Sequence, residues 1–399
     1  MNYIIFDNFR RNYLLPLTFV RPVCDIRVGI LTIREKWERY LGSPTSTLTE
    51  PYLSEKFPMK KEAVNILING SVIPNAGLAA QVAALKPRQA LVSQSIIIAM
   101  HVSEEDLLED LDKVDSSASP VEELEAAGSF LKLNHLWDIF SLNGAAMEED
   151  YRLLTEGRKS APIPKSNRIN GSDIFIEEGA KVEMAYLNAS SGPIYIGRDA
   201  EIMEGAMIRG PFALLDHAVI KMGAKIYGAS TFGPYCKVGG EVNNSVFLGY
   251  SNKAHDGFIG NSVIGEWCNI GADTNNSNLK NNYDEVRLWS YPDQTFIPTS
   301  LQFCGLILGD HSKCAINTMF NTGTVVGVSA NIFGPGFQRN FIPSFVWGGT
   351  MGFSTFKFER AMEVAERVYQ RRDIVLDDIE RRILKHVYET TRSNKRLMD

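Results

Sequence analysis

The sequence lacks the features of a membrane-spanning or secreted protein. No apolar run approaches the ~20 residues that a membrane-spanning helix needs. The N-terminal residues, MNYIIFDNFRR, contain no basic region followed by a long apolar core, as a secretory signal would. We therefore expect a cytoplasmic protein without a membrane partner.

Cysteine is scarce, and so is any block of charge of one sign. The 399 residues include five cysteines, an odd number, and no two of them form a C-x-x-C pair. This pattern argues against disulfides and structural zinc, and we expect no metal-ligating residues in the chain. The net charge is only −6 and no run of lysine and arginine occurs, so we expect no nucleic-acid partner.

A six-residue repeat dominates the second half of the chain. From Ile196 to Val238 every sixth residue is bulky and apolar, and the residue four positions after each is mostly small. The pattern returns in a new frame from Leu308 to Ile332, after a loop-like stretch, residues 247–279. A triangular coil of short parallel strands requires this period, because one aliphatic side chain fills the interior and the tight corner admits little else. Weaker members of the repeat are Ile176, Ile264 and Ile270.

These patterns divide the chain into four parts. We expect an α/β domain over residues 1–140 and a helical connector with a linker over 141–165. Residues 166–352 should form a left-handed parallel β-helix of hexapeptide repeats. Residues 353–399 have apolar positions at helical spacing and should form a C-terminal helical segment.

The segment EVNNSVFLGYSNKAHDGFIGNSVIGEWCNIGADTNNSNL, residues 241–279, carries a family resemblance. It is similar to the E-V-K-N-S…K-x-x-H…G-x-x-x-I-G…N-x-G-A-G-T…N-Y/L segment of the bifunctional N-acetylglucosamine-1-phosphate uridyltransferase/glucosamine-1-phosphate acetyltransferases. The resemblance implies transfer of an acetyl group from acetyl-CoA to an amino sugar phosphate, with His255 as general base. It also implies a homotrimer with active sites between subunits.

The resemblance implies roles for further residues as well. Those assigned to the sugar phosphate are Glu241, Asn243, Phe258, Asn269 and Asn278, together with Lys237 and Lys253; those assigned to acetyl-CoA are Ala272, Asp273 and Thr274. The chemistry fits, because the attacking amine must lose a proton and a histidine titrates near neutral pH. The alternative is that His255 is an ordinary loop histidine and the asparagines only shape turns.

The sequence also departs from the family pattern. The G-A-G-T motif gains a carboxylate at Asp273, and the tyrosine after the histidine becomes Phe258. Two cationic contacts to the sugar phosphate are replaced by Asn243 and Gly239, so Lys237 or Lys253 would have to take their place.

The N-terminal stretches LLPLTFVRPVCDIRVGIL and NILINGSVIPN resemble sugar-phosphate nucleotidylyltransferases, which use Mg²⁺ and a nucleoside triphosphate. The glycine-rich loop of that family is DNFRRN here, and its signature arginine, lysine and aspartate fall on other residue types. Two interpretations stay open: a domain that has rebuilt its site around arginines, or a degenerate domain kept for packing and regulation. The candidates for nucleotide binding are Arg10, Arg11 and Arg21.

The sequence therefore predicts an acetyl-CoA-dependent acetyltransferase with a small-molecule sugar phosphate as substrate, in which the N-terminal domain could add nucleotidyl transfer. One alternative is a sugar-1-phosphate nucleotidylyltransferase, for uridylyl or thymidylyl transfer, whose β-helix serves binding or assembly. Another is a trimeric scaffold without catalysis. Binding tests separate the three. Acetyl-CoA binding to the coil would favour the acetyltransferase, triphosphate binding to residues 1–140 would favour the nucleotidylyltransferase, and binding of neither would favour the scaffold.

Overall fold

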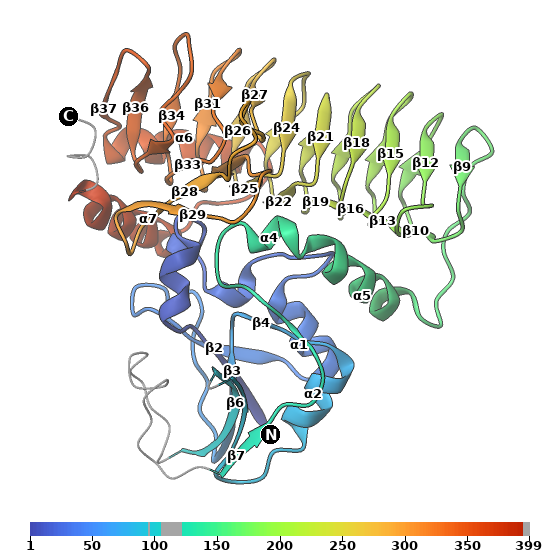
Figure 1. Cartoon of the computed structure of the whole chain (residues 1–399), viewed down its shortest axis with the longest axis vertical. Coiled ribbons are helices and arrows are strands. Elements are labelled where there is room, and N and C mark those ends of the chain that lie inside the picture. Colours follow the sequence, from blue (N-terminus) through green and yellow to red (C-terminus); the bar gives the residue numbers. More distant parts are fainter. Residues whose placement is uncertain (95, 105–121, 394–399) are drawn as a thin grey trace. The chain divides into compact units, whose positions relative to one another are not determined.

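The computed structural model describes residues 1–94, 96–104 and 122–393, which form two compact units (Figure 1). The N-terminal unit comprises Met1–Ile26 and Leu31–His135, and the β-helix unit comprises Arg27–Ile30 and Leu136–Asp399. Across the described residues, no helix combines the length and the apolar character needed to cross a membrane.

The N-terminal unit is an α/β fold around a mixed six-stranded sheet. β1 is parallel to β2 and β3, whereas β6 is antiparallel to β3 and β5. In sheet order the strands are β2 (Thr45–Leu48), β1 (Asn2–Phe6), β3 (Val64–Asn69), β6 (Ile96–Ser103), β5 (Gln89–Ser93) and β7 (Glu122–Glu125). The other elements are β4 (Val72–Ile73), β8 (Leu131–Lys132), α1 (Ile33–Leu41), α2 (Ala76–Ala83) and the 3-10 helices Phe9–Leu14, Leu17–Phe19 and Val23–Asp25.

Local sequence explains where α1 begins and ends. The Thr32 hydroxyl accepts a hydrogen bond from the Glu35 amide, while the Glu35 carboxylate accepts one from the Thr32 amide. This capping box satisfies backbone donors that the first turn would otherwise leave free. The helix stops at Gly42, whose φ of 62° suits a residue without a Cβ.

The β-helix unit contains the expected left-handed parallel β-helix, whose three faces are three parallel sheets. The first sheet consists of β10 (Ile174–Ile176), β13 (Ile194–Ile196), β16 (Phe212–Leu214), β19 (Ser230–Phe232), β22 (Val246–Gly249), β25 (Val263–Glu266), β30 (Leu306–Leu308), β33 (Thr324–Val326) and β35 (Phe341–Ile342). The second consists of β11 (Lys181–Val182), β14 (Glu201–Ile202), β17 (Val219–Ile220), β20 (Lys237–Val238), β23 (Asn252–Lys253), β26 (Asn269–Ile270), β31 (Lys313–Cys314), β34 (Asn331–Ile332) and β36 (Val346–Gly349), with β37 (Gly352–Thr355) added antiparallel. The third consists of β9 (Arg168–Asn170), β12 (Tyr186–Asn188), β15 (Met207–Arg209), β18 (Lys225–Tyr227), β21 (Glu241–Asn243) and β24 (Phe258–Gly260), and the short pair β27 (Asn275–Asn276) and β32 (Met319–Phe320) follows it.

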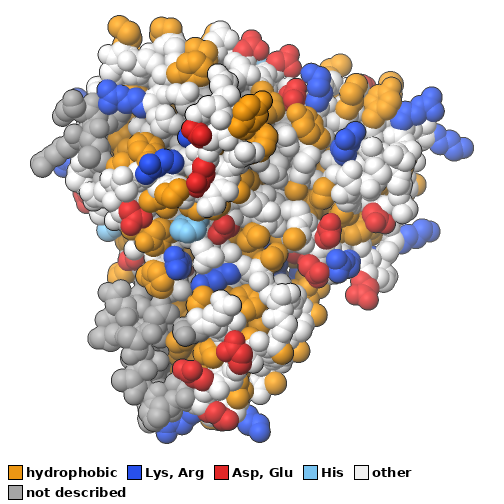
Figure 2. Space-filling model, viewed as in Figure 1, with side chains coloured by type: hydrophobic (Ala, Val, Ile, Leu, Met, Phe, Trp, Pro, Cys, Tyr) orange, Lys and Arg blue, Asp and Glu red, His pale blue; other side chains and the backbone are white. Residues whose placement is uncertain are grey.

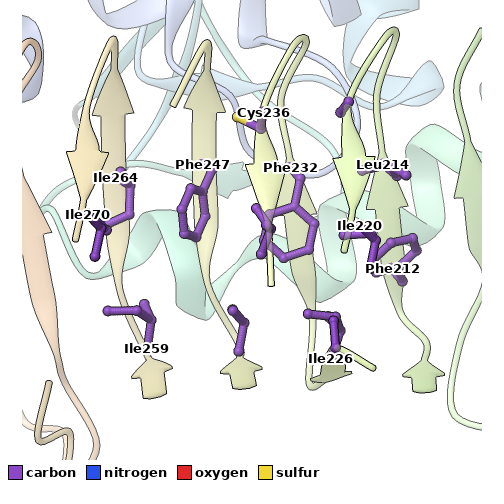
Figure 3. Packing of buried hydrophobic residues seen from close by; sticks show 14 of the residues in the cluster. Phe212, Leu214, Ile220, Ile226, Phe232, Cys236, Phe247, Ile259, Ile264 and Ile270 are labelled. Carbon is purple, nitrogen blue, oxygen red and sulfur yellow. The ribbon is translucent and has the colours of Figure 1, made fainter. Parts of the chain in front are cut away.

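Side chains of the six-residue repeat form the core of the coil, as the sequence predicts. In the first sheet Ile196 pairs with Leu214, and Leu214 pairs with Phe232 on the next coil. Figure 3 shows Leu214 and Phe232, with other members of the core, pointing inward from successive strands. The residues four positions later, such as Ala200, Ala218 and Cys236, are fully buried at the corners.

The change of repeat frame has two structural causes. Coils near the middle are shorter than 18 residues, because Phe232 pairs with Phe247 and Phe247 pairs with Ile264. Ile264 then pairs with Leu308, so the coil between them carries an insertion, which includes the antiparallel hairpin of β28 (Arg287–Ser290) and β29 (Thr295–Pro298). Residues 247–279, which looked loop-like in the sequence, are regular coil.

Helices precede and follow the β-helix in the sequence. The connector forms α4 (Asp138–Ser141) and α5 (Asn143–Thr155), and the Asn143 amide group donates to the Ala229 carbonyl at 2.8 Å. The C-terminal segment is helical, as expected, and contains two helices, α6 (Phe358–Gln370) and α7 (Asp378–Thr390). They are separated by a turn at Asp373, whose φ is 56°.

A column of stacked rings runs along the corner between the first and second sheets. Its members all have a left-handed backbone, with φ between 54° and 61°. Adjacent ring centroids lie 4.7, 5.2, 4.3 and 6.5 Å apart, and the rings are nearly parallel. Tyr369 of α6 stacks on this column, 3.9 Å from Trp267, and so fixes the helix against the coil. The column consists of His217, Tyr235, Tyr250, Trp267 and His311.

Candidate functional site

His255 lies on the corner between β23 and β24, and its side chain is exposed. Its imidazole forms no hydrogen bond with any residue that the structure describes. Gly257, in the same corner, has a φ of 112°, and a Cβ there would lie 2.2 Å from the Thr274 carbonyl oxygen. Only glycine fits this position, so the His255 corner packs directly against the corner of the next coil.

The residues assigned to acetyl-CoA form that next corner. The Asp273 amide donates to the Asp256 carbonyl at 3.0 Å, and the Asp273 side chain is exposed. Thr274 is buried, and its hydroxyl donates to the Ala315 carbonyl at 3.2 Å. Ala272 is half-buried. The structure thus places all three next to His255, with only the Asp273 side chain fully accessible.

Lys253 occupies a position in the core of the coil. It pairs with Val238, in the column where other coils have aliphatic residues, and its side chain is only 1% exposed. Its ammonium donates to the His255 carbonyl at 2.5 Å. Burial lowers the pKa of Lys253 to about 8, against opposing attraction from Asp256 and Asp273. This placement favours a role in holding the His255 corner over direct contact with a substrate.

Four of the predicted substrate residues lie on or beside the third sheet. Glu241 pairs in register with Phe258 and accepts a 2.6 Å hydrogen bond from the Tyr227 hydroxyl, which raises the pKa of Tyr227 to about 12. Glu241 and Tyr227 line a cavity of about 800 Å³ along this sheet. Asn243 is half-buried on β21, and the Asn278 amide group donates to the Asn261 side chain at 2.8 Å.

Lys237 and Asn269 lie on the second sheet, where they line a different cavity of about 460 Å³. Ala254, directly before His255, lines it too. Within one chain the predicted substrate residues are therefore divided between two faces of the coil. His255 lies at the corner where these two faces meet.

The arginines predicted to bind a nucleotide are mostly engaged within the N-terminal unit. Arg11 is buried, pairs with Asp7 at 3.3 Å and donates to the Tyr52 hydroxyl at 2.8 Å. Arg21 is buried and donates to the Leu17 carbonyl at 2.9 Å. Only Arg10 is partly accessible, with its guanidinium 4.8 Å from the centre of the Phe9 ring. Burial raises the pKa of Asp7, which also accepts from the Val23 amide, so Asp7 is engaged within the unit as Arg11 and Arg21 are.

Two residues on the second and third sheets were not identified from the sequence as candidates for the site. Tyr227, the partner of Glu241, becomes visible only when the coils are set in register, because β18 pairs with β21. Lys313 pairs with Asn269 across the insertion, which hides their relation in the sequence. Among the described residues, no cluster of histidine, cysteine, aspartate or glutamate could hold a metal ion.

Comparisons with known proteins support part of the expected assignment. A family model described as sugar nucleotidyl transferase matches residues 3–159. A solved structure titled as an Arabidopsis UDP-N-acetylglucosamine acyltransferase is 15% identical, with 59% of this chain and 91% of that chain covered and a TM-score of 0.22. No curated protein matches the sequence. The family match supports a sugar-related transferase as the coarse class of the protein.

Replacing Lys253 by methionine should remove a pH-dependent penalty on stability. With a folded-state pKa of about 8 against an ordinary 10.5, the unfolded chain binds more protons than the folded protein between these values. The free-energy cost of burying the charged ammonium is therefore fully present below pH 8, and it decreases as the pH rises towards 10.5. Between pH 7 and pH 10.5 we expect the unfolding free energy of the wild type, measured relative to that of Lys253→Met, to rise by about 3 kcal/mol.

Urea unfolding followed by circular dichroism at a series of pH values measures this difference. Lys181→Met, at an exposed position of the same sheet, serves as the control and should show no such gain. A wild-type to Lys253→Met difference that stays constant with pH would contradict the expected pKa.

Proposed function

We propose that the protein transfers the acetyl group of acetyl-CoA to the amine of an amino sugar phosphate of the glucosamine 1-phosphate class. The observation that carries this proposal is the His255 corner. An accessible imidazole that forms no hydrogen bond with the described residues is held there by Lys253 and Gly257, between two cavities large enough for small molecules.

The proposed reaction is a direct transfer. The sugar amine attacks the thioester carbonyl, the new C–N bond forms as the C–S bond breaks, and CoA leaves as the thiolate. His255 accepts the proton that the amine loses and passes it to the thiolate, which gives the free thiol of CoA. All five cysteines are buried, and burial raises the pKa of Cys236, Cys268, Cys304 and Cys314. A thiolate nucleophile is therefore disfavoured in the coil, which supports transfer without a covalent enzyme intermediate.

The residues around the corner suit the two substrates in different ways. Asn269 and Lys237 offer donors on the second sheet, and Glu241 and Asn278 offer polar groups on or beside the third. Asparagine can both donate and accept, so it suits sugar hydroxyls or an acyl carbonyl. Ala272 and Asp273 lie at the adjacent corner, where we propose that acetyl-CoA passes.

His255→Ala should lower acetyl transfer at least ~10²-fold, because a general base contributes about that much to such a step. The measurement is thiol release from acetyl-CoA by the purified full chain with glucosamine 1-phosphate. His217→Ala is a matched control, since His217 is also an exposed histidine at a coil corner. Thiol release by neither the wild type nor the control, across a panel of amino sugar phosphates, would reject acetyl transfer.

We also propose that the protein assembles as a homotrimer in which a second copy completes the site at His255. Support comes from apolar side chains on the third sheet: Ile169, Tyr186, Met207 and Tyr227 are exposed, and all line its cavity. Figure 2 shows hydrophobic side chains among charged ones along this part of the β-helix. Such a row of accessible apolar groups is characteristic of an interface.

Met207→Asp should therefore weaken the assembly, because an interface would bury the new charge without a partner. Sedimentation equilibrium should give three chains per particle for the wild type and a smaller mass for the variant, together with less acetyl transfer. Met222→Asp, at an exposed methionine outside the cavity lining, should keep the wild-type mass. A wild-type protein with the mass of one chain would reject the trimer.

A second candidate function is nucleotidyl transfer by the N-terminal unit, which the family match over residues 3–159 favours. It predicts pyrophosphate release from UTP or dTTP with Mg²⁺ and a sugar 1-phosphate. Arg10→Ala should reduce the rate at least ~10-fold if this accessible arginine contacts the triphosphate. Arg39→Ala, on the exposed side of α1, is the control. No pyrophosphate release would favour the interpretation that this unit is kept for packing, and the absence of both activities would favour a scaffold.

A further inference from the structure

The cavity of about 460 Å³ on the second sheet is strongly cationic. Lys237, Lys313, Arg371 and Arg372 all line it, and among the residues that the structure describes no aspartate or glutamate does. Two of these side chains come from strands of the coil and two from the end of α6 and the turn after it. Four positive groups around one small space repel one another, so the arrangement is costly unless an anion enters.

The two lysines belong to a regular row across four coils. Lys237 pairs with Asn252, Asn252 with Asn269, and Asn269 with Lys313. The neighbouring residues Val238, Lys253, Ile270 and Cys314 are buried in the coil, so the members of the row face outward. Adjacent strands lie about 4.8 Å apart, and the row therefore presents two cations with two amides between them.

The two arginines are brought over this row by contacts that α6 makes with the coil. Tyr369 stacks on Trp267 at 3.9 Å, and the Arg372 guanidinium donates to the Tyr235 carbonyl at 2.9 Å and to the Asn252 side chain at 3.3 Å. Arg371 is exposed and forms no ion pair with any described residue. One arginine is thus fixed in place, while the other is available to a ligand.

The electrostatics of the lysines agree with this geometry. The pKa of Lys237 is lowered by burial first and then by repulsion from Arg372, Lys221 and Arg371. Burial lowers the pKa of Lys313 to about 8, and its ammonium donates to the His311 carbonyl at 2.9 Å. Neither lysine is neutralised by a carboxylate in the cavity lining, so a bound anion would stabilise the charged form of both.

We propose that this cavity binds the phosphate groups of a small molecule, such as a sugar phosphate or the pyrophosphate of a nucleotide. Guanidinium groups pair with phosphate oxygens through parallel hydrogen bonds, and the asparagines add neutral donors. The volume lies in the range of about 300–1,000 Å³ that is usual for small-molecule sites, which is larger than a bare ion needs. The inference does not depend on acetyl transfer, although Lys237 and Asn269 take part in both proposals.

Isothermal titration calorimetry on the full chain tests the site with defined probes. Pyrophosphate should bind, and its affinity should fall as salt is added, because exposed charges are screened. Arg371→Ala should weaken binding ~10- to 100-fold, as expected for the loss of hydrogen bonds to a charged group. Lys237→Gln, which keeps a polar side chain of similar length, should weaken it as well. Glucose 1-phosphate and ADP, as separate titrants, distinguish a sugar phosphate from a nucleotide pyrophosphate.

Two controls separate this site from the proposed reaction. Arg360→Ala lies on the same helix but pairs with Glu363 outside the cavity, so it should leave pyrophosphate binding unchanged. His255→Ala should also bind pyrophosphate as the wild type does, even if it loses acetyl transfer. The inference is overturned if none of the three probes binds at millimolar concentration, or if Arg371→Ala and Arg360→Ala have the same effect.

Discussion

The β-helix depends on one packing constraint, which is that the inward side chains of each coil must fill the space between three sheets. Ile196, Leu214 and Phe232 meet this constraint on successive coils, each in register with the next. Because every coil rests on its neighbours, the position of each outward side chain follows from the inward one beside it. The rows and corners that carry the candidate site are consequences of this core.

The constraint is relaxed where the candidate site lies. Lys253 replaces an aliphatic residue in one inward column, and buried Asn276 holds the Gly260 amide and carbonyl in another. Buried polar groups are tolerated only when they are satisfied, and both of these bind backbone atoms of nearby corners or strands. The hydrogen bonds that satisfy them also fix the segment around His255, so the polar part of the core supports the shape of that surface.

The sequence is sufficient to predict the coil because its period belongs to no other common structure. The inward residues from Ile196 to Val238 could all be identified from spacing alone, and the structure confirms them. The inward position of Lys253 could not be predicted, since the preceding coil is shorter and a lysine is rarely placed in a core. The pairing of Asn269 with Lys313 was hidden by the insertion between them, and Arg371 reaches the same cavity only through the docking of α6. Contacts between segments that are far apart in the sequence cannot be predicted from a local sequence pattern.

The antiparallel strand β37 also limits how far the second sheet can extend. A stack of parallel coils ends in strand edges that present unpaired backbone groups, and an identical stack could in principle continue from such an edge. After β36 the chain reverses, so β37 occupies the last edge of the second sheet in the opposite direction. A further coil in the parallel register has no place there. The hairpin thus closes this end of the second sheet, so an identical stack cannot continue from that edge by adding a parallel strand.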